Sequence, residues 1–153
     1  MRKNSAASKG SIICTASNAG LYPFPIAPLY GTSKHAVVGA VRALAKPLEA
    51  DNIQINALCP NVIGTTSLLI GLRAGKLTND PATGLADENL FSKMILTPIS
   101  VAVDAIREFV TNHELTGTIA EISGDKFTFR SPPEYVDDIT KKNFDSFWAL
   151  GYA

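Results

Sequence analysis

Tyr30 and Lys34 are the residues whose types and spacing point most directly to chemistry in this chain. Residues four apart lie one above the other on a helix, so a helix here would place the Lys34 ammonium beside the Tyr30 phenol. A free phenol is a poor base at neutral pH, and a nearby cation favours its charged form. Ser17, thirteen residues before Tyr30, adds a hydroxyl that could hold a substrate oxygen. The three side chains therefore suggest a site that moves a proton to or from that oxygen.

Other reactive residue types in the chain receive a less specific interpretation. Thr15 lies two residues before Ser17 and would point to the same side of an extended strand, so it stays open as the alternative hydroxyl. No group of residues has the spacing of a metal site. The histidines and cysteines are interpreted as surface, helix-packing or core residues: His35, His113, Cys14 and Cys59.

The elements around these residues begin with a short apolar run at 11–15, typical of a strand buried on both faces. Residues 16–29 contain three prolines and are predicted to form a bent loop. Apolar residues at helical spacing predict a helix over 30–49, with Pro47 expected to kink or end it near its last turn. A second strand is predicted over 52–59, ended by Pro60.

The second half of the chain opens with a long mixed stretch at 61–96, which we interpret as a substrate loop or lid. It could hold short helices at 66–73 and 87–94. A helix over 98–112 and a strand over 117–122 follow. The remaining predictions are a turn at 124–125, a short strand at 126–129 and a polar tail at 131–153 with late aromatic residues.

Alternating strands and helices predict an α/β fold, because parallel strands need crossover connections. We expect one domain over residues 1–153, with about three strands in a parallel sheet. Such a sheet needs helices on both faces, and only two long helices are predicted. The set of elements therefore looks like half of a larger domain.

Composition excludes several classes of function. The chain has 14 Lys plus Arg and 14 Asp plus Glu, so no basic stripe favours nucleic acid. Apolar residues make up 46% and charged residues 18%, as in globular proteins. The longest apolar runs are too short to cross a membrane, and the two cysteines suggest no disulfide framework. A reduced, cytoplasmic setting is the expectation.

Several segments together resemble the C-terminal half of a short-chain dehydrogenase/reductase, although each alone is common by chance. They are GSII at 10–13, Ser17, Ala19 with Gly20, YGTSKHA at 30–36, INALCP at 55–60 and Thr65. The resemblance is close over residues 10–66 and extends to 97–130 at the level of elements. It implies a partial Rossmann-like, doubly wound parallel sheet.

The resemblance also implies roles for individual residues. Tyr30 would be the acid/base, Ser17 would hold the substrate oxygen, and Lys34 would favour the Tyr30 phenolate and bind the nicotinamide ribose. The cofactor would be NAD or NADP, and the substrate a secondary alcohol or ketone. The leucine-rich part of the 61–96 loop favours a medium-sized apolar substrate over a sugar phosphate. Relatives often pair through the Tyr-bearing helix, here 30–49, which makes a homo-oligomer an expectation.

Further cofactor contacts are implied by a Pro-Gly-x-x-x-Thr pattern, whose backbone and Thr meet the nicotinamide carboxamide in relatives. Pro60, Val62 and Thr65 align with it. Asn61 stands where the family usually has Gly, and Asn tolerates the left-handed backbone region better than most residues.

The sequence departs from the family in lacking a glycine-rich phosphate loop, which normally precedes the catalytic strand. We therefore expect a truncated form that holds only the nicotinamide end of NAD or NADP, with weak or absent binding and no activity in isolation. Its first strand would leave an open apolar sheet edge. The alternative is a catalytically inactive remnant, or an interaction module without dinucleotide binding.

Overall fold

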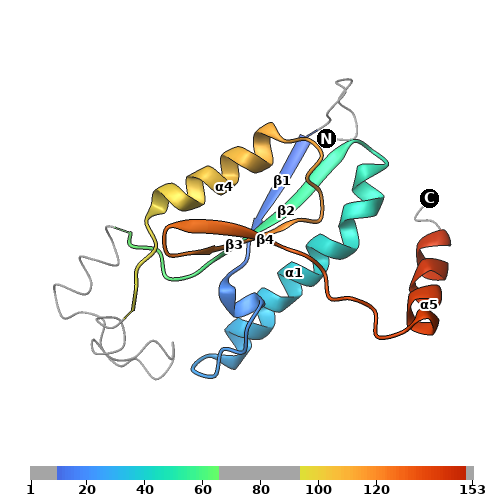
Figure 1. Ribbon diagram of the computed structural model, residues 1–153, viewed down its shortest axis with the longest axis horizontal. Helices are drawn as coiled ribbons and strands as arrows, with labels where there is room; N and C mark the ends of the chain where they lie inside the picture. Colours follow the sequence, from blue (N-terminus) through green and yellow to red (C-terminus); the bar gives the residue numbers. More distant parts are fainter. Residues whose placement is uncertain (1–9, 66–93, 151–153) are drawn as a thin grey trace.

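The computed structural model describes residues 10–65 and 94–150, which form four strands and four helical segments (Figure 1). The two predicted helices in the 61–96 loop fall outside these residues, except for position 94. In chain order the elements are β1 (Gly10–Thr15), the 3-10 helix η1 (Asn18–Gly20), α1 (Pro28–Glu49), β2 (Ile53–Pro60), α4 (Ile99–Thr111), β3 (Ile119–Ser123), β4 (Lys126–Arg130) and α5 (Asp138–Ala149).

The four strands form one sheet in the order β1-β2-β3-β4. β1 pairs with β2 and β2 with β3 in parallel, which confirms the predicted α/β class and the three parallel strands. β4 returns beside β3 in the antiparallel direction, through the turn at Gly124. Among the described residues β1 pairs only with β2, so it forms one edge of the sheet.

Helices cover both faces of this sheet, with α1 on one side and α4 on the other (Figure 1). The α1 layer packs Val38 and Val41 against Ile55 of β2. The α4 layer places Phe109, which is fully buried, against Ala120 and other residues of β3. β2 lies between the two layers and is buried along nearly its whole length, as expected for a central parallel strand.

α1 begins earlier than the sequence predicted. Its first residue is Pro28, which was assigned to the preceding loop, so the predicted start at Tyr30 was wrong by two residues. Proline fits the first turn of a helix because its fixed φ is helical and its missing N–H has no partner there. Pro47 lies inside the last turn, and the helix ends two residues later at Glu49.

The C-terminal tail contains a helix that the sequence analysis missed. α5 begins after Asp137, whose carboxylate accepts a hydrogen bond from the Thr140 backbone N–H at 2.7 Å. An Asp cap of this kind satisfies a free N–H at the helix start. α5 has no buried residue and lies beside the sheet-and-helix layers (Figure 1). The sequence analysis described these residues only as a polar tail with late aromatic residues.

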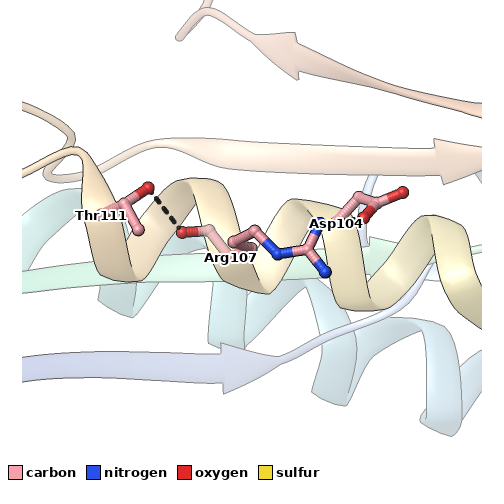
Figure 2. Close-up of polar contacts among 3 residues, drawn as sticks. All are labelled: Asp104, Arg107 and Thr111. Carbon is pink, nitrogen blue, oxygen red and sulfur yellow. Dashed lines mark hydrogen bonds and ion pairs between the residues drawn. The ribbon is translucent and has the colours of Figure 1, made fainter.

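The solvent side of α4 carries polar contacts within the helix (Figure 2). Arg107 pairs with Asp104 at 2.6 Å, and the Thr111 hydroxyl donates to the Arg107 carbonyl at 2.9 Å. Both charged side chains are more than half exposed, and such surface pairs contribute only about 0–1 kcal/mol. We therefore attribute the position of α4 to its buried face.

Candidate active site

A cavity of about 280 Å³ opens where β1 and β2 end, beside the first turn of α1. Parallel sheets commonly bind ligands at the carboxyl ends of their strands. Ser17 follows β1 and Val62 follows β2, so the sheet brings these two segments together. The cavity is lined by Ser17, Asn18, Ala19, Tyr22, Pro23, Phe24, Tyr30, Pro60, Asn61 and Val62.

Ser17 is the N-cap of η1. Its hydroxyl oxygen accepts a hydrogen bond from the Ala19 backbone N–H at 3.2 Å, which leaves its own O–H available to donate. Gly20 lets η1 approach α1 closely, because a Cβ at this position would lie 2.6 Å from the Lys34 carbonyl oxygen. The short helix that carries Ser17 is therefore fixed against the helix that carries Lys34.

Tyr30 and Lys34 lie one turn apart on α1, as predicted. Lys34 Nζ is 5.5 Å from the centre of the Tyr30 ring and donates to the Thr15 carbonyl oxygen at 3.1 Å. Tyr30 is 44% exposed, and its ring tilts against Phe24 at a centroid distance of 5.8 Å. Lys34 contacts Tyr30 but does not itself line the cavity, and neither does Thr15, the alternative hydroxyl.

The segment after β2 carries the other predicted site residues. Pro60 and Val62 line the cavity, whereas Thr65 does not. Thr65 follows a one-residue bridge between Ile63 and Thr97, and its backbone N–H donates to the Ile63 carbonyl at 2.8 Å. The structure therefore brings Ser17, Tyr30, Pro60 and Val62 to one cavity and leaves Thr65 outside its lining.

Asn61 holds the turn after β2 without entering the left-handed region. Among the described non-glycine residues, only Asn52 has a positive φ. The Asn61 side chain instead donates to Ser123 Oγ at 3.3 Å and accepts from the Val62 backbone N–H at 2.9 Å. Its backbone N–H donates to the Ile122 carbonyl at 2.8 Å. Hydrogen bonds of the Asn61 side chain thus fix this turn, for which we expected a residue in the left-handed backbone region.

Tyr22 is a cavity residue that the sequence analysis missed. Its hydroxyl donates to Glu121 Oε1 at 2.9 Å, and Glu121 Oε2 pairs with Arg130 Nε at 3.3 Å. The hydrogen bond to this carboxylate raises the pKa of Tyr22. Glu121 lies 99 residues further along the chain, so no local pattern could reveal the contact. The only sequence feature that could have indicated a role for Tyr22 was the presence of aromatic residues close to Ser17.

Cys59 lies on β2 just before these turns and is fully buried. Burial raises the pKa of its thiol to about 11, which disfavours the reactive thiolate. Within residues 10–65 and 94–150, no group of His, Cys, Asp or Glu could hold a metal ion. No helix in the described part of the chain is long and apolar enough to cross a membrane.

Comparison with known proteins gives a consistent set of relatives. The sequence profile of the short chain dehydrogenase family matches residues 1–77. The chain is 30% identical over 144 residues to the short-chain dehydrogenase/reductase prx7 of Penicillium rubens, over 90% of this chain and 50% of that protein. It is 48% identical over 58 residues to a cis-2,3-dihydrobiphenyl-2,3-diol dehydrogenase of Pseudomonas sp., over 38% of this chain and 21% of that protein.

Among solved structures, ElxO with NADP bound matches with a TM-score of 0.58 and 27% identity, over 74% of this chain and 45% of that one. The chain thus spans half or less of the length of these relatives. The shared fold is a Rossmann-like α/β sheet. Because the family profile matches half of its residues and these relatives agree with it, the chain belongs to the short-chain dehydrogenase/reductase family.

Proposed function

We propose that this chain carries the proton-transfer residues of an NAD(P)-dependent oxidoreductase that interconverts a secondary alcohol and a ketone. The supporting observation is that Ser17 and Tyr30 line one cavity while Lys34 Nζ lies 5.5 Å from the Tyr30 ring centre. Family membership supports the reaction class, and the named diol dehydrogenase among the relatives supports an alcohol substrate.

Each of the three side chains has a separate task in this proposal. Ser17 donates its O–H to the substrate oxygen and holds it at the cavity wall. Tyr30 takes the hydroxyl proton when an alcohol is oxidised and returns it when a ketone is reduced. The Lys34 ammonium lies close enough to stabilise negative charge on the phenol, as a cation beside a developing anion does.

The donor set fits the nicotinamide end of a dinucleotide. When bound, NAD or NADP supplies the hydride acceptor or donor for the reaction. Lys34 has three N–H donors and the structure uses one on Thr15, so the others could hold ribose hydroxyls. Pro60 and Val62, which line the cavity, would border the carboxamide, whereas the contact of Thr65 rests on the resemblance alone because Thr65 lies outside the lining. We expect weak or absent binding to the 153-residue chain alone, because its sequence has no glycine-rich loop for the pyrophosphate.

One contact favours a second candidate, a module of the same fold without dinucleotide binding. The Val62 N–H, which would meet the carboxamide, already donates to Asn61 Oδ1 at 2.9 Å. A cofactor would have to replace this bond. Asn61→Gly frees the N–H, so calorimetric titration with NADH and NADPH separates the two candidates. Tighter binding by Asn61→Gly supports a dinucleotide site. Because weak or absent binding by the 153-residue chain is expected in either case, absence of binding favours the module only when it is seen in a longer protein that joins this chain to a glycine-rich cofactor half.

The proton-transfer proposal is tested by Tyr30→Phe in a longer protein that joins this chain to the glycine-rich cofactor half of a family member, because the 153-residue chain alone is expected to bind the cofactor weakly or not at all. Turnover is followed by absorbance of the reduced nicotinamide. General acid–base groups contribute about 10²- to 10⁴-fold, so a loss of that size is expected with the fold unchanged. Tyr135→Phe is the matched control, because Tyr135 is 43% exposed and does not line the cavity. A Tyr30→Phe protein with full turnover would contradict the assigned proton role.

A further inference from the structure

Part of the cavity lining is aromatic. Three rings line the cavity, from Tyr22, Phe24 and Tyr30. The Phe24 and Tyr30 rings are 5.8 Å apart and inclined at 56°, so they meet as a tilted aromatic pair. Such rings offer faces and edges that favour another flat ring at a defined angle.

Tyr22 is held in this lining by a contact from the opposite end of the sequence. Its hydroxyl donates to Glu121 at 2.9 Å, and the second oxygen of that carboxylate pairs with Arg130 at 3.3 Å. The Glu121 side chain is only 16% exposed, whereas Tyr22 is 44% exposed, so the acceptor of this bond is mostly covered and its donor lies at the surface. Glu121 belongs to β3 and Arg130 to β4, which fastens the loop after Ser17 to the sheet.

The hydroxyl and the ring of Tyr22 have different roles in this arrangement. The hydroxyl donates to Glu121, which does not line the cavity, so we assign proton exchange with the substrate to Tyr30 and not to Tyr22. What Tyr22 offers to the cavity is its aromatic ring. A group fixed in this way selects a substrate by shape and does not exchange protons with it.

We propose that Tyr22 determines specificity for secondary alcohols and ketones that bear an aromatic ring next to the reacting carbon, and that Glu121 is the residue that positions it. This inference rests on the proposed function, since Ser17 and Tyr30 define where the reacting oxygen lies. A cavity of about 280 Å³ is near the lower limit of small-molecule sites, which suits a single ring with a short side chain.

The test uses the full chain and two probes with the same skeleton, 1-phenylethanol and 1-cyclohexylethanol. Binding is measured by ligand-observed NMR titration, which needs no cofactor. We expect 1-phenylethanol to be preferred, and Tyr22→Ala to lower that preference by about 3- to 10-fold, the range of an aromatic contact. Tyr135→Ala is the control, because its ring pairs with Phe144 outside the cavity lining.

The anchor is tested by a double-mutant cycle between Tyr22→Phe and Glu121→Ala. Each single change leaves the ring but removes its hydrogen bond, so each should lower the preference by about 2- to 3-fold, and the double variant should lose no more than either. Circular dichroism establishes that each variant is folded. Additive losses would overturn the role of Glu121. Equal binding of the two probes, an unchanged preference in Tyr22→Ala, or no binding of either probe would overturn the specificity role.

The two proposals fail in different ways. Turnover of alcohols without a ring preference would refute the specificity inference and keep the oxidoreductase. A ring preference that depends on Tyr22, in a protein whose turnover does not depend on Tyr30, would refute the proton-transfer mechanism and keep the aromatic site.

Discussion

Replacing a single glycine by alanine should have opposite effects at two positions of the structure. Gly39 lies on α1 with open space around it, whereas a Cβ at Gly20 would lie 2.6 Å from the Lys34 carbonyl oxygen and 2.8 Å from its carbon. Both substitutions reduce the freedom of the unfolded chain in the same way. Only Gly20→Ala places a new Cβ against the backbone of Lys34. The difference in stability between the two variants therefore measures the effect of the close contact between η1 and α1.

The magnitudes follow from this geometry. Real Cβ atoms essentially never approach another heavy atom closer than 3.0 Å, so Gly20→Ala requires a shift of at least 3.0 − 2.6 = 0.4 Å in η1 or α1. Overpacking of this kind costs about 1–3 kcal/mol, and the unfolded-state effect returns about 0.4–1 kcal/mol. We expect Gly20→Ala to lower the free energy of unfolding by about 1.3 kcal/mol, the difference between the middles of these two ranges, and by about 2.6 kcal/mol at most. Gly39→Ala should raise it by about 0.5–1 kcal/mol.

The assay is urea unfolding of both variants and the parent chain, followed by circular dichroism. Similar slopes against urea would show that the midpoints report the free energy of unfolding. Because Gly20 sets the distance between the segment bearing Ser17 and the helix bearing Lys34, the same substitution should also reduce turnover in a longer protein that joins this chain to a glycine-rich cofactor half. A Gly20→Ala protein as stable as the parent, or a destabilised Gly39→Ala protein, would refute the role given to this contact.

Two further predictions concern buried polar groups. Asn56→Leu should lower the free energy of unfolding by about 1–3 kcal/mol, because it leaves the Thr118 N–H without its 3.0 Å acceptor. The exposed Asn143→Leu should change it by less than about 0.5 kcal/mol in the same urea titration. Cys59 should resist thiol reagents in the native protein and react in urea, and rapid native labelling would contradict its burial. Burial raises the pKa of the Cys59 thiol from 9.0 to about 11, so the stability linked to its protonation is complete below pH 9.0 and is lost toward pH 11.

Local patterns in the sequence predicted most of the sheet and its two covering helices. The apolar run at 11–15 and the helical spacing after Tyr30 correspond to β1 and α1. The periodicity of α1 reflects the face that packs on the sheet, where Val38 and Val41 are buried. The prediction that 11–15 is buried on both faces was wrong: β1 is an edge strand among the described residues, its first five residues are half-buried and Thr15 is exposed. The parallel pairing followed from the alternation of strands and helices and is confirmed by the register of β1, β2 and β3.

The errors arose where tertiary contacts or capping decide the structure. The start of α1 depends on Pro28 at its first position, and the existence of α5 depends on the Asp137 cap more than on burial. The antiparallel direction of β4 is set by the tight turn at Gly124, where the strand returns beside β3. In the candidate site, the Tyr22–Glu121 bond joins residues 99 positions apart, which no local pattern encodes.

The pairing of β1 and β2 determines the geometry of the candidate site more than the loops that carry its residues do. Thr15, the last residue of β1, pairs with Leu58 in the parallel register, and β2 ends two residues later at Pro60, so the segments after both strands begin at the same end of the sheet. That register is strongly specified, because a shift of one residue would turn the buried side chains of β2 toward the opposite layer. Lys34 then joins α1 to this edge through its 3.1 Å bond to the Thr15 carbonyl. Mutations that loosen the pairing of β1 and β2 should therefore impair the site even when they lie outside the cavity.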